Sequence, residues 1–156
     1  MDILDNNSIF NLPKVLCAKV MTTYTLFFLE KKSNINLFFS FVHIFKRDGG
    51  AQSIATIPLN RFPKEASDSI IFIFAIWGIS QFLMAMIYSA ILWKYQTLLP
   101  FGTLHFTLEN IFRILLKTFT DKKMVTEKRP PAAILNIVFV PLGIFLFWNS
   151  LPTFKN

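Results

Sequence analysis

The chain has 156 residues, enough for one domain, and 53% of them are hydrophobic whereas 16% are charged. A water-soluble domain of this length needs a polar outer shell, but here the apolar residues gather in blocks, which favours lipid as the surrounding medium. The net charge of +7 comes from Lys and Arg residues that flank these blocks, so it predicts contact with anionic lipid headgroups and excludes nucleic acid as the expected partner.

The N-terminal segment, residues 1–22, is expected to precede the first membrane span. It begins with the acidic sequence MDILDNN and lacks the basic region of a cleavable signal peptide, so we expect the transmembrane helices themselves to direct insertion. Its Cys17 is the one cysteine of the chain, which excludes an intrachain disulfide.

The first span is predicted over residues 23–45. Two apolar stretches, residues 15–29 and 34–45, are each shorter than the ~20 residues of a crossing, and the charged residues 30–32 separate them. One helix through both would place these charges in the outer third of the bilayer, where long side chains can reach the headgroups. A frayed or re-entrant segment is the alternative.

The loop 46–68 connects the first two spans. Gly49 and Gly50 follow the apolar stretch closely and are typical of the left-handed residue that ends a helix. Pro63 and Glu65 suit the beginning of the next helix, because proline fits the first turn and an acidic residue favours the positive end of the helix dipole.

The second span, residues 69–93, is an uncharged run between Asp68 and Lys94. At about 1.5 Å per residue, its 25 residues can cross a hydrocarbon core of roughly 30 Å with some tilt. Trp93 and Tyr95 lie at its far boundary, where amphipathic aromatic rings prefer the headgroup level.

The third span is predicted over residues 96–118, although Glu109 and Arg113 lie within it. It could instead be an amphipathic helix that lies on the membrane surface. A true crossing gives the clearer asymmetry of basic residues between the two sides of the membrane, so we prefer it.

The fourth span, residues 131–151, is uncharged and precedes a short tail, residues 152–156. Pro141 and Gly143 would weaken a helix in water, but a membrane helix tolerates them where neighbouring helices satisfy the freed carbonyl group. Trp148 marks the interface.

Four crossings place the loops 46–68 and 117–130 on one side of the membrane. These loops hold nine basic residues: Lys46, Arg47, Arg61, Lys64, Lys117, Lys122, Lys123, Lys128 and Arg129. The opposite side holds four: Lys14, Lys19, Lys94 and Lys155. Because cytoplasmic loops carry an excess of Lys and Arg, we expect both loops in the cytoplasm and both termini outside. The predicted fold is an all-α integral membrane protein, an antiparallel four-helix transmembrane bundle formed by residues 23–151.

A polar stripe crosses the third span. His105, Glu109 and Arg113 are four residues apart, so they lie along one face of a helix. A carboxylate near the bilayer centre is costly, and Arg113 is its natural partner. The stripe is therefore either a structural ion pair that holds helices together or a polar pathway with Glu109 as a proton or cation site.

Other polar residues are secondary candidates for the same interior: Gln81, Asn110 and Asn136, together with His43 and Asp48 near the cytoplasmic edge. The expected depths of His43 and His105 differ by too much for both to bind one metal or haem. We find no catalytic, cofactor-binding or metal-binding motif, because the sequence has no glycine-rich phosphate loop, H-E-x-x-H pattern or cysteine pair.

Four stretches carry a family resemblance: VHIFKRDGGAQSIATIPL, FAIWGISQF, LENIFRIL and AILNIVFVPLGIFLF. Over about residues 34–151 the chain resembles small bacterial inner-membrane proteins with four helices, a family of unknown function. The resemblance implies the bacterial inner membrane as the location and brings no activity with it.

Three functional hypotheses follow from the sequence. The first is a non-enzymatic accessory or self-associating bundle whose partners are the bilayer, a second copy or another membrane protein. The second is a small carrier or proton- or ion-coupled transporter that uses Glu109. The third is a membrane-embedded enzyme acting on a lipid or quinone, for which His43 and Asp48 are the nearest candidates.

Overall fold

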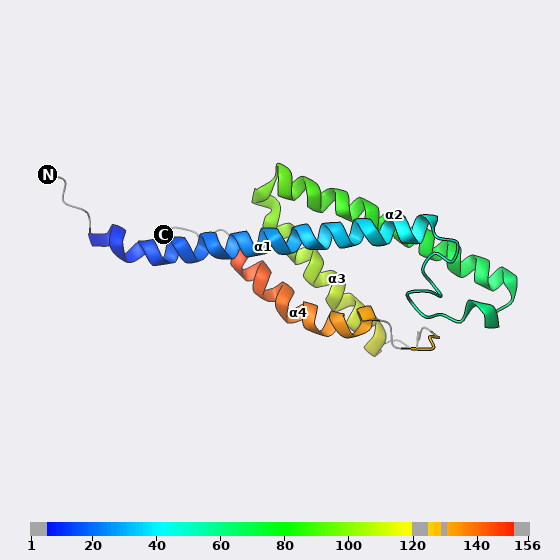
Figure 1. Ribbon diagram of the computed structural model, residues 1–156. Coiled ribbons are helices and arrows are strands. Elements are labelled where there is room, and N and C mark those ends of the chain that lie inside the picture. The colour runs from blue at the N-terminus through cyan, green and yellow to red at the C-terminus, as the bar shows by residue number, and fades with distance from the viewer. Residues whose placement is uncertain (1–5, 120–124, 129–130, 152–156) are drawn as a thin grey trace.

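The computed structural model describes residues 6–119, 125–128 and 131–151, and these residues form helices and turns but no strand (Figure 1). The elements are α1 (Asn6–Phe45), η1 (Leu59–Arg61), α2 (Lys64–Trp93), η2 (Gln96–Leu98), α3 (Leu99–Phe119) and α4 (Pro131–Ser150). The prediction of an all-helical chain with four long helices is confirmed. Lys122, Lys123, Arg129 and the tail 152–156 lie outside the described residues.

Helix α1 is a single helix of 40 residues, about 60 Å long, and it continues without interruption through the charged residues 30–32. The expected helix over residues 23–45 is therefore present, and its C-terminal end at Phe45 agrees with the expectation. The helix begins earlier, at Asn6, and extends past the other helices at that end (Figure 1).

The prediction that Gly49 and Gly50 cap α1 is wrong. The helix ends at Phe45, and both glycines lie in the turn that follows it, with φ angles of +57° and +75°. The Asp48 carboxylate organises this turn, because it accepts hydrogen bonds from the backbone amides of Gly50 (3.1 Å) and Ser53 (2.8 Å). The glycines therefore allow a compact turn between α1 and α2.

Helices α1 and α2 pack along a seam of small and polar residues. The buried face of α1 has a spacing of three or four residues and comprises Thr25, Leu29, Ser33, Asn36, Ser40 and His43. On α2, a Cβ atom at Gly78 would lie 2.8 Å from the His43 Cβ atom, so the two backbones approach closely there. The Ser33 hydroxyl donates to the Ala85 carbonyl oxygen at 3.0 Å and lies 3.0 Å from the Ser89 hydroxyl. Small residues at such contacts are typical of membrane helices.

Helices α3 and α4 form a second antiparallel pair that packs against α1 (Figure 1). Gly143 makes the close approach, because a Cβ atom there would lie 2.5 Å from the Thr107 hydroxyl oxygen. Pro141 lies inside α4 without ending it. Thr103 and Ser150 join the far ends of the pair, with 3.1 Å between their hydroxyl oxygens.

Large apolar side chains cover the outside of the molecule. On α2, for example, Phe72, Ile73 and Leu83 are each more than half exposed, as are Phe38 on α1 and Phe112 on α3. Helix α2 is the one helix among the described residues that is long and apolar enough to span a membrane, and only 17% of its apolar window is buried. Most of this apolar window is therefore not covered by the other described residues.

The two predicted loops meet at one end of the bundle. The Glu127 amide donates to the Thr56 carbonyl oxygen at 2.9 Å, and the Thr56 hydroxyl donates to the Lys128 carbonyl oxygen at 2.9 Å. An ion pair of 3.0 Å joins Arg61 to Glu127. Residues that follow α1 and residues that precede α4 therefore lie side by side.

Candidate functional site

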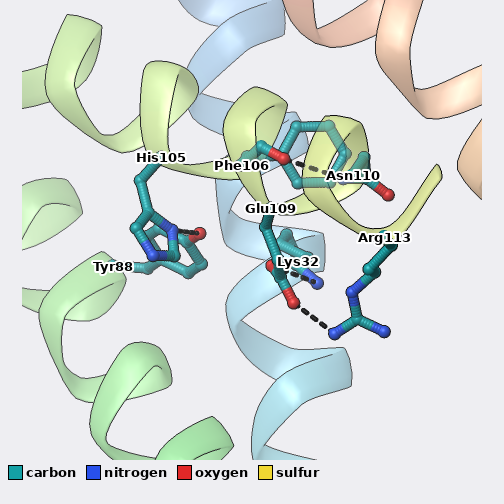
Figure 2. Close-up of polar contacts among 7 residues, drawn as sticks. All are labelled: Lys32, Tyr88, His105, Phe106, Glu109, Asn110 and Arg113. Atoms are coloured by element: carbon teal, nitrogen blue, oxygen red, sulfur yellow. Dashed lines mark hydrogen bonds and ion pairs between the residues drawn. The ribbon is translucent and has the colours of Figure 1, made fainter. Parts of the chain in front are cut away.

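The centre of the polar stripe is a three-residue ion-pair cluster of Lys32, Glu109 and Arg113 (Figure 2). Arg113 donates from Nη2 to Oε1 of Glu109, one helical turn earlier on α3. The Lys32 Nζ atom of α1 lies 3.7 Å from the second carboxylate oxygen, Oε2. Both oxygens of Glu109 therefore have a cationic neighbour, and the cluster joins α1 to α3.

The side chains of the cluster are mostly buried, but each of them remains partly exposed to the surroundings of the protein. The exposed fractions of the side chains are 19% for Lys32, 27% for Glu109 and 33% for Arg113. Two cations and one anion leave one net positive charge in this part of the bundle. An arrangement of this kind can fasten two helices, and it can also attract an anion or exchange a proton.

His105 begins the stripe at the other end and pairs with Tyr88 of α2 (Figure 2). The Tyr88 hydroxyl lies 2.9 Å from Nδ1 of His105, and the tyrosine is fully buried. His105 of α3 contacts Tyr88 of α2, and Glu109 of α3 contacts Lys32 of α1. The stripe therefore joins α3 to both of these helices. His105, Glu109 and Arg113 thus contact neighbouring helices and are each partly buried.

Aromatic rings continue the stripe beyond Arg113. The guanidinium group lies 5.5 Å from the centre of the Trp77 ring, a cation–π geometry, and Trp77 stacks on His43 with 4.9 Å between ring centres. His43 is buried, and its Nδ1 atom lies 2.6 Å from the Gly49 carbonyl oxygen, so Nδ1 donates the hydrogen bond. The two histidines thus have separate neighbours, as their expected depths predicted.

Asp48 belongs to the turn after α1 and not to the cluster. Its carboxylate accepts the two amide hydrogen bonds of the turn, and Lys46 Nζ lies 4.0 Å away. Burial alone would raise the pKa of the Asp48 carboxyl, but the hydrogen bonds from Ser53 and Gly50 and the charge of Lys46 outweigh burial and hold this pKa below its ordinary value. Asp48 is therefore an ionised organiser of the turn.

The remaining candidates do not join the cluster. Asn110 is buried, and its side-chain amide donates to the Phe106 carbonyl oxygen of its own helix at 2.8 Å (Figure 2). Gln81 is half-buried, and its Oε1 atom is buried without a hydrogen-bond partner among the described residues. Asn136 is half-buried on α4.

Sequence reasoning missed three members of this region: Lys32, Tyr88 and Trp77. Lys32 belongs to the charged residues 30–32, and the sequence does not indicate its partner because Glu109 lies on a distant segment. Tyr88 and Trp77 are aromatic residues in an apolar run, and nothing in their local sequence indicates that they contact a polar residue.

The described residues contain no group of three or more His, Cys, Asp or Glu residues that could hold a metal ion. In comparisons with known proteins, no family model, no curated protein and no solved structure matches the chain.

Proposed function

We propose that this chain is a multi-pass membrane protein that acts as a non-enzymatic accessory or self-associating helical bundle. The observation that carries the proposal is an apolar exterior around a core that contains both apolar and polar side chains. Large apolar side chains such as Phe72 and Phe112 face outward, whereas small or polar ones such as Ser33, Ser40 and Thr107 are buried. Water would penalise such an exterior, but hydrocarbon stabilises it, and small residues then allow close helix packing.

The positions of the charged residues support four crossings. Helices α1 and α3 hold charges within their predicted spans, and the apolar part of α4 is shorter among the described residues, so α2 alone is both long and apolar enough to span a membrane. Lys32, Glu109 and Arg113 face one another between helices, so three of these charges are sheltered from the surrounding medium. Contact between the loops 46–68 and 117–130 favours their location on one side, and their basic residues favour the cytoplasm.

The cluster is best interpreted as a fastening between α1 and α3. Both Glu109 oxygens are engaged, and the i,i+4 pair with Arg113 needs no ligand. Replacing Glu109 with Gln would leave two cations without a counter-charge, so we expect a loss of about 1.5–3 kcal/mol in the free energy of unfolding. The double variant Glu109→Gln/Lys32→Met should recover part of this loss, because it removes one of the unpaired cations.

Thermal unfolding of the purified protein in detergent measures both variants. Lys32→Met alone is the matched control, since it leaves Glu109 paired with Arg113 and should cost less than Glu109→Gln. An unchanged melting temperature in Glu109→Gln would contradict the fastening role.

A carrier that uses Glu109 is the second candidate, favoured by the incomplete shielding of Glu109 and Arg113. It requires that Glu109→Gln abolish proton or ion movement in reconstituted vesicles while the fold stays intact. Unchanged flux would remove this candidate. An enzymatic role has no comparable support, because the Nδ1 atom of His43 and both carboxylate oxygens of Asp48 form hydrogen bonds with the backbone of the turn.

Two measurements test the proposal as a whole. Alkaline carbonate should leave the protein in the membrane pellet, and detergent should release it. Crosslinking in native membranes should then yield a dimer or a complex with a second membrane protein. Release by carbonate would refute the membrane assignment, whereas monomer alone would refute the accessory or self-associating role.

A further inference from the structure

A groove of about 570 Å³ lies between α1 and α2, close to the end at which α2 terminates. Its walls include Phe27, Glu30 and Asn34 of α1 and Ser89 and Trp93 of α2, and Gln96 of η2 completes it. The contact between the Ser33 and Ser89 hydroxyl groups lies at this groove, so polar atoms and aromatic rings line one space.

Glu30 gives the groove its charge. The side chain is exposed, and it forms no ion pair with any residue in the part of the chain that the structure describes. Lys31, its neighbour, instead lies with Nζ 4.8 Å from the centre of the Phe27 ring. The groove therefore holds a carboxylate without a counter-ion, and a lysine ammonium group is close to its wall.

Aromatic side chains complete the recognition chemistry. Trp93 is 92% exposed, so its ring is open to a ligand, whereas the Lys31 ammonium group already lies over the Phe27 ring. A carboxylate beside such an open ring suits an organic cation, which binds the carboxylate by charge and the ring by a cation–π contact. The amide side chains of Asn34 and Gln96 add hydrogen-bond acceptors, which favour an N–H-bearing ammonium group over a quaternary one.

We propose that this groove binds the primary ammonium headgroup of a phospholipid. The inference rests on the proposed membrane location, because Trp93 and Lys94 end the uncharged run of α2 and so mark the headgroup level. A soluble amine would need only Glu30 and the rings. A zwitterionic lipid also uses the Lys31 ammonium group for its phosphate and the apolar walls at Leu26 and Leu92 for its chains.

Native mass spectrometry of the full chain in nanodiscs tests this proposal. With equal amounts of phosphatidylethanolamine and phosphatidylglycerol, the wild-type protein should retain the ethanolamine lipid in preference. In Glu30→Gln this preference should fall about three- to tenfold, because the ion pair with the ammonium group is lost. Glu65→Gln is the matched control, since this exposed carboxylate at the other end of α2 should leave the preference unchanged.

A second variant separates lipid binding from folding. Trp93→Leu should also reduce the preference for the ethanolamine lipid. Both Glu30→Gln and Trp93→Leu should stay in the membrane after alkaline carbonate, which shows that they still insert. An equal lipid preference in the wild-type protein and Glu30→Gln would overturn the proposal while leaving the membrane assignment intact. Displacement of the lipid by millimolar soluble ethanolamine would also overturn it, because the ligand would then be a free amine. Release of the wild-type protein by carbonate would instead refute the proposed function.

Discussion

Polar side chains in this molecule find their partners inside the chain. Thr25, Thr107 and Asn110 each donate to the carbonyl oxygen four residues earlier on their own helix. In the proposed membrane location no water is available to accept these hydrogen bonds, so an internal partner avoids the cost of an unsatisfied donor. Glu109 likewise has a cationic neighbour at each of its two oxygens.

Gln81 departs from this pattern and gives a first prediction. Its buried Oε1 atom has no partner among the described residues, and such an atom costs about 1–3 kcal/mol. Gln81→Leu has a similar volume and should raise the free energy of unfolding by about 1 kcal/mol, measured by thermal unfolding in detergent. Gln81→Glu should lower it, because it buries a charge. Destabilisation by leucine would indicate that Gln81 has a polar partner in the assembled protein.

Asp48 gives a prediction about pH. Because the pKa of its carboxyl is lower in the folded protein than in the unfolded chain, ionised Asp48 stabilises the fold at every pH above the unfolded pKa of about 3.9. This contribution is lost as the pH falls through the lower, folded pKa. The melting temperature should therefore decrease below about pH 4 in the wild-type protein.

In Asp48→Asn, the melting temperature at pH 7 should already be lower, and its decrease below pH 4 should be smaller. Glu65→Gln is a suitable control, since Glu65 is exposed and forms no ion pair with other described residues. Identical pH profiles for Asp48→Asn and the wild-type protein would contradict the role of Asp48 in the turn.

At the scale of helices, the local sequence predicts where an apolar helix begins or ends. It does not predict which residues of different helices contact each other. The uncharged runs gave the C-terminal end of α2 at Trp93 and the start of α4 at Pro131. The i,i+4 spacing gave the Glu109–Arg113 pair, because both residues lie on one helix. Lys32 could not be assigned in the same way, since its partner Glu109 lies on a distant segment.

The contact between α3 and α4 gives a prediction about Gly143. In an isolated helix, alanine is more favourable than glycine by up to about 1 kcal/mol. Here the added Cβ atom would lie 2.5 Å from the Thr107 hydroxyl oxygen and 3.2 Å from the Phe106 ring, so Gly143→Ala should be destabilising instead. Gly143→Ala/Thr107→Ala should recover stability, because it removes the clashing hydroxyl.

Thermal unfolding in detergent measures this pair of variants, and Thr107→Ala alone serves as the control. A melting temperature above that of the wild-type protein in Gly143→Ala would show that helix propensity outweighs packing. The helices would then approach each other less closely than the structure indicates.

At the scale of the whole molecule, two helix pairs are joined by contacts that a sequence does not reveal. Apolar blocks predicted four helices, and four crossings predicted that the loops 46–68 and 117–130 lie together. The mutual contact of Thr56 with Glu127 and Lys128 agrees with that arrangement, although these residues carry no recognisable motif. Because consecutive helices run in opposite directions, the two loops come to the same end of the molecule. Which side chains pair there can be seen only in the folded structure.

The proposed orientation in a bacterial inner membrane gives the last prediction. Single cysteines are introduced into a Cys17→Ser background at three exposed positions. Ser53 and Glu127 lie in the two loops, and Thr97 lies at the opposite end of the bundle. A membrane-impermeant maleimide should label positions 53 and 127 in inverted vesicles and position 97 in intact spheroplasts, because basic loops stay in the cytoplasm. Labelling in detergent controls for reactivity. If positions 53 and 127 reacted from opposite sides, α3 would lie on the membrane surface and the bundle would have three crossings.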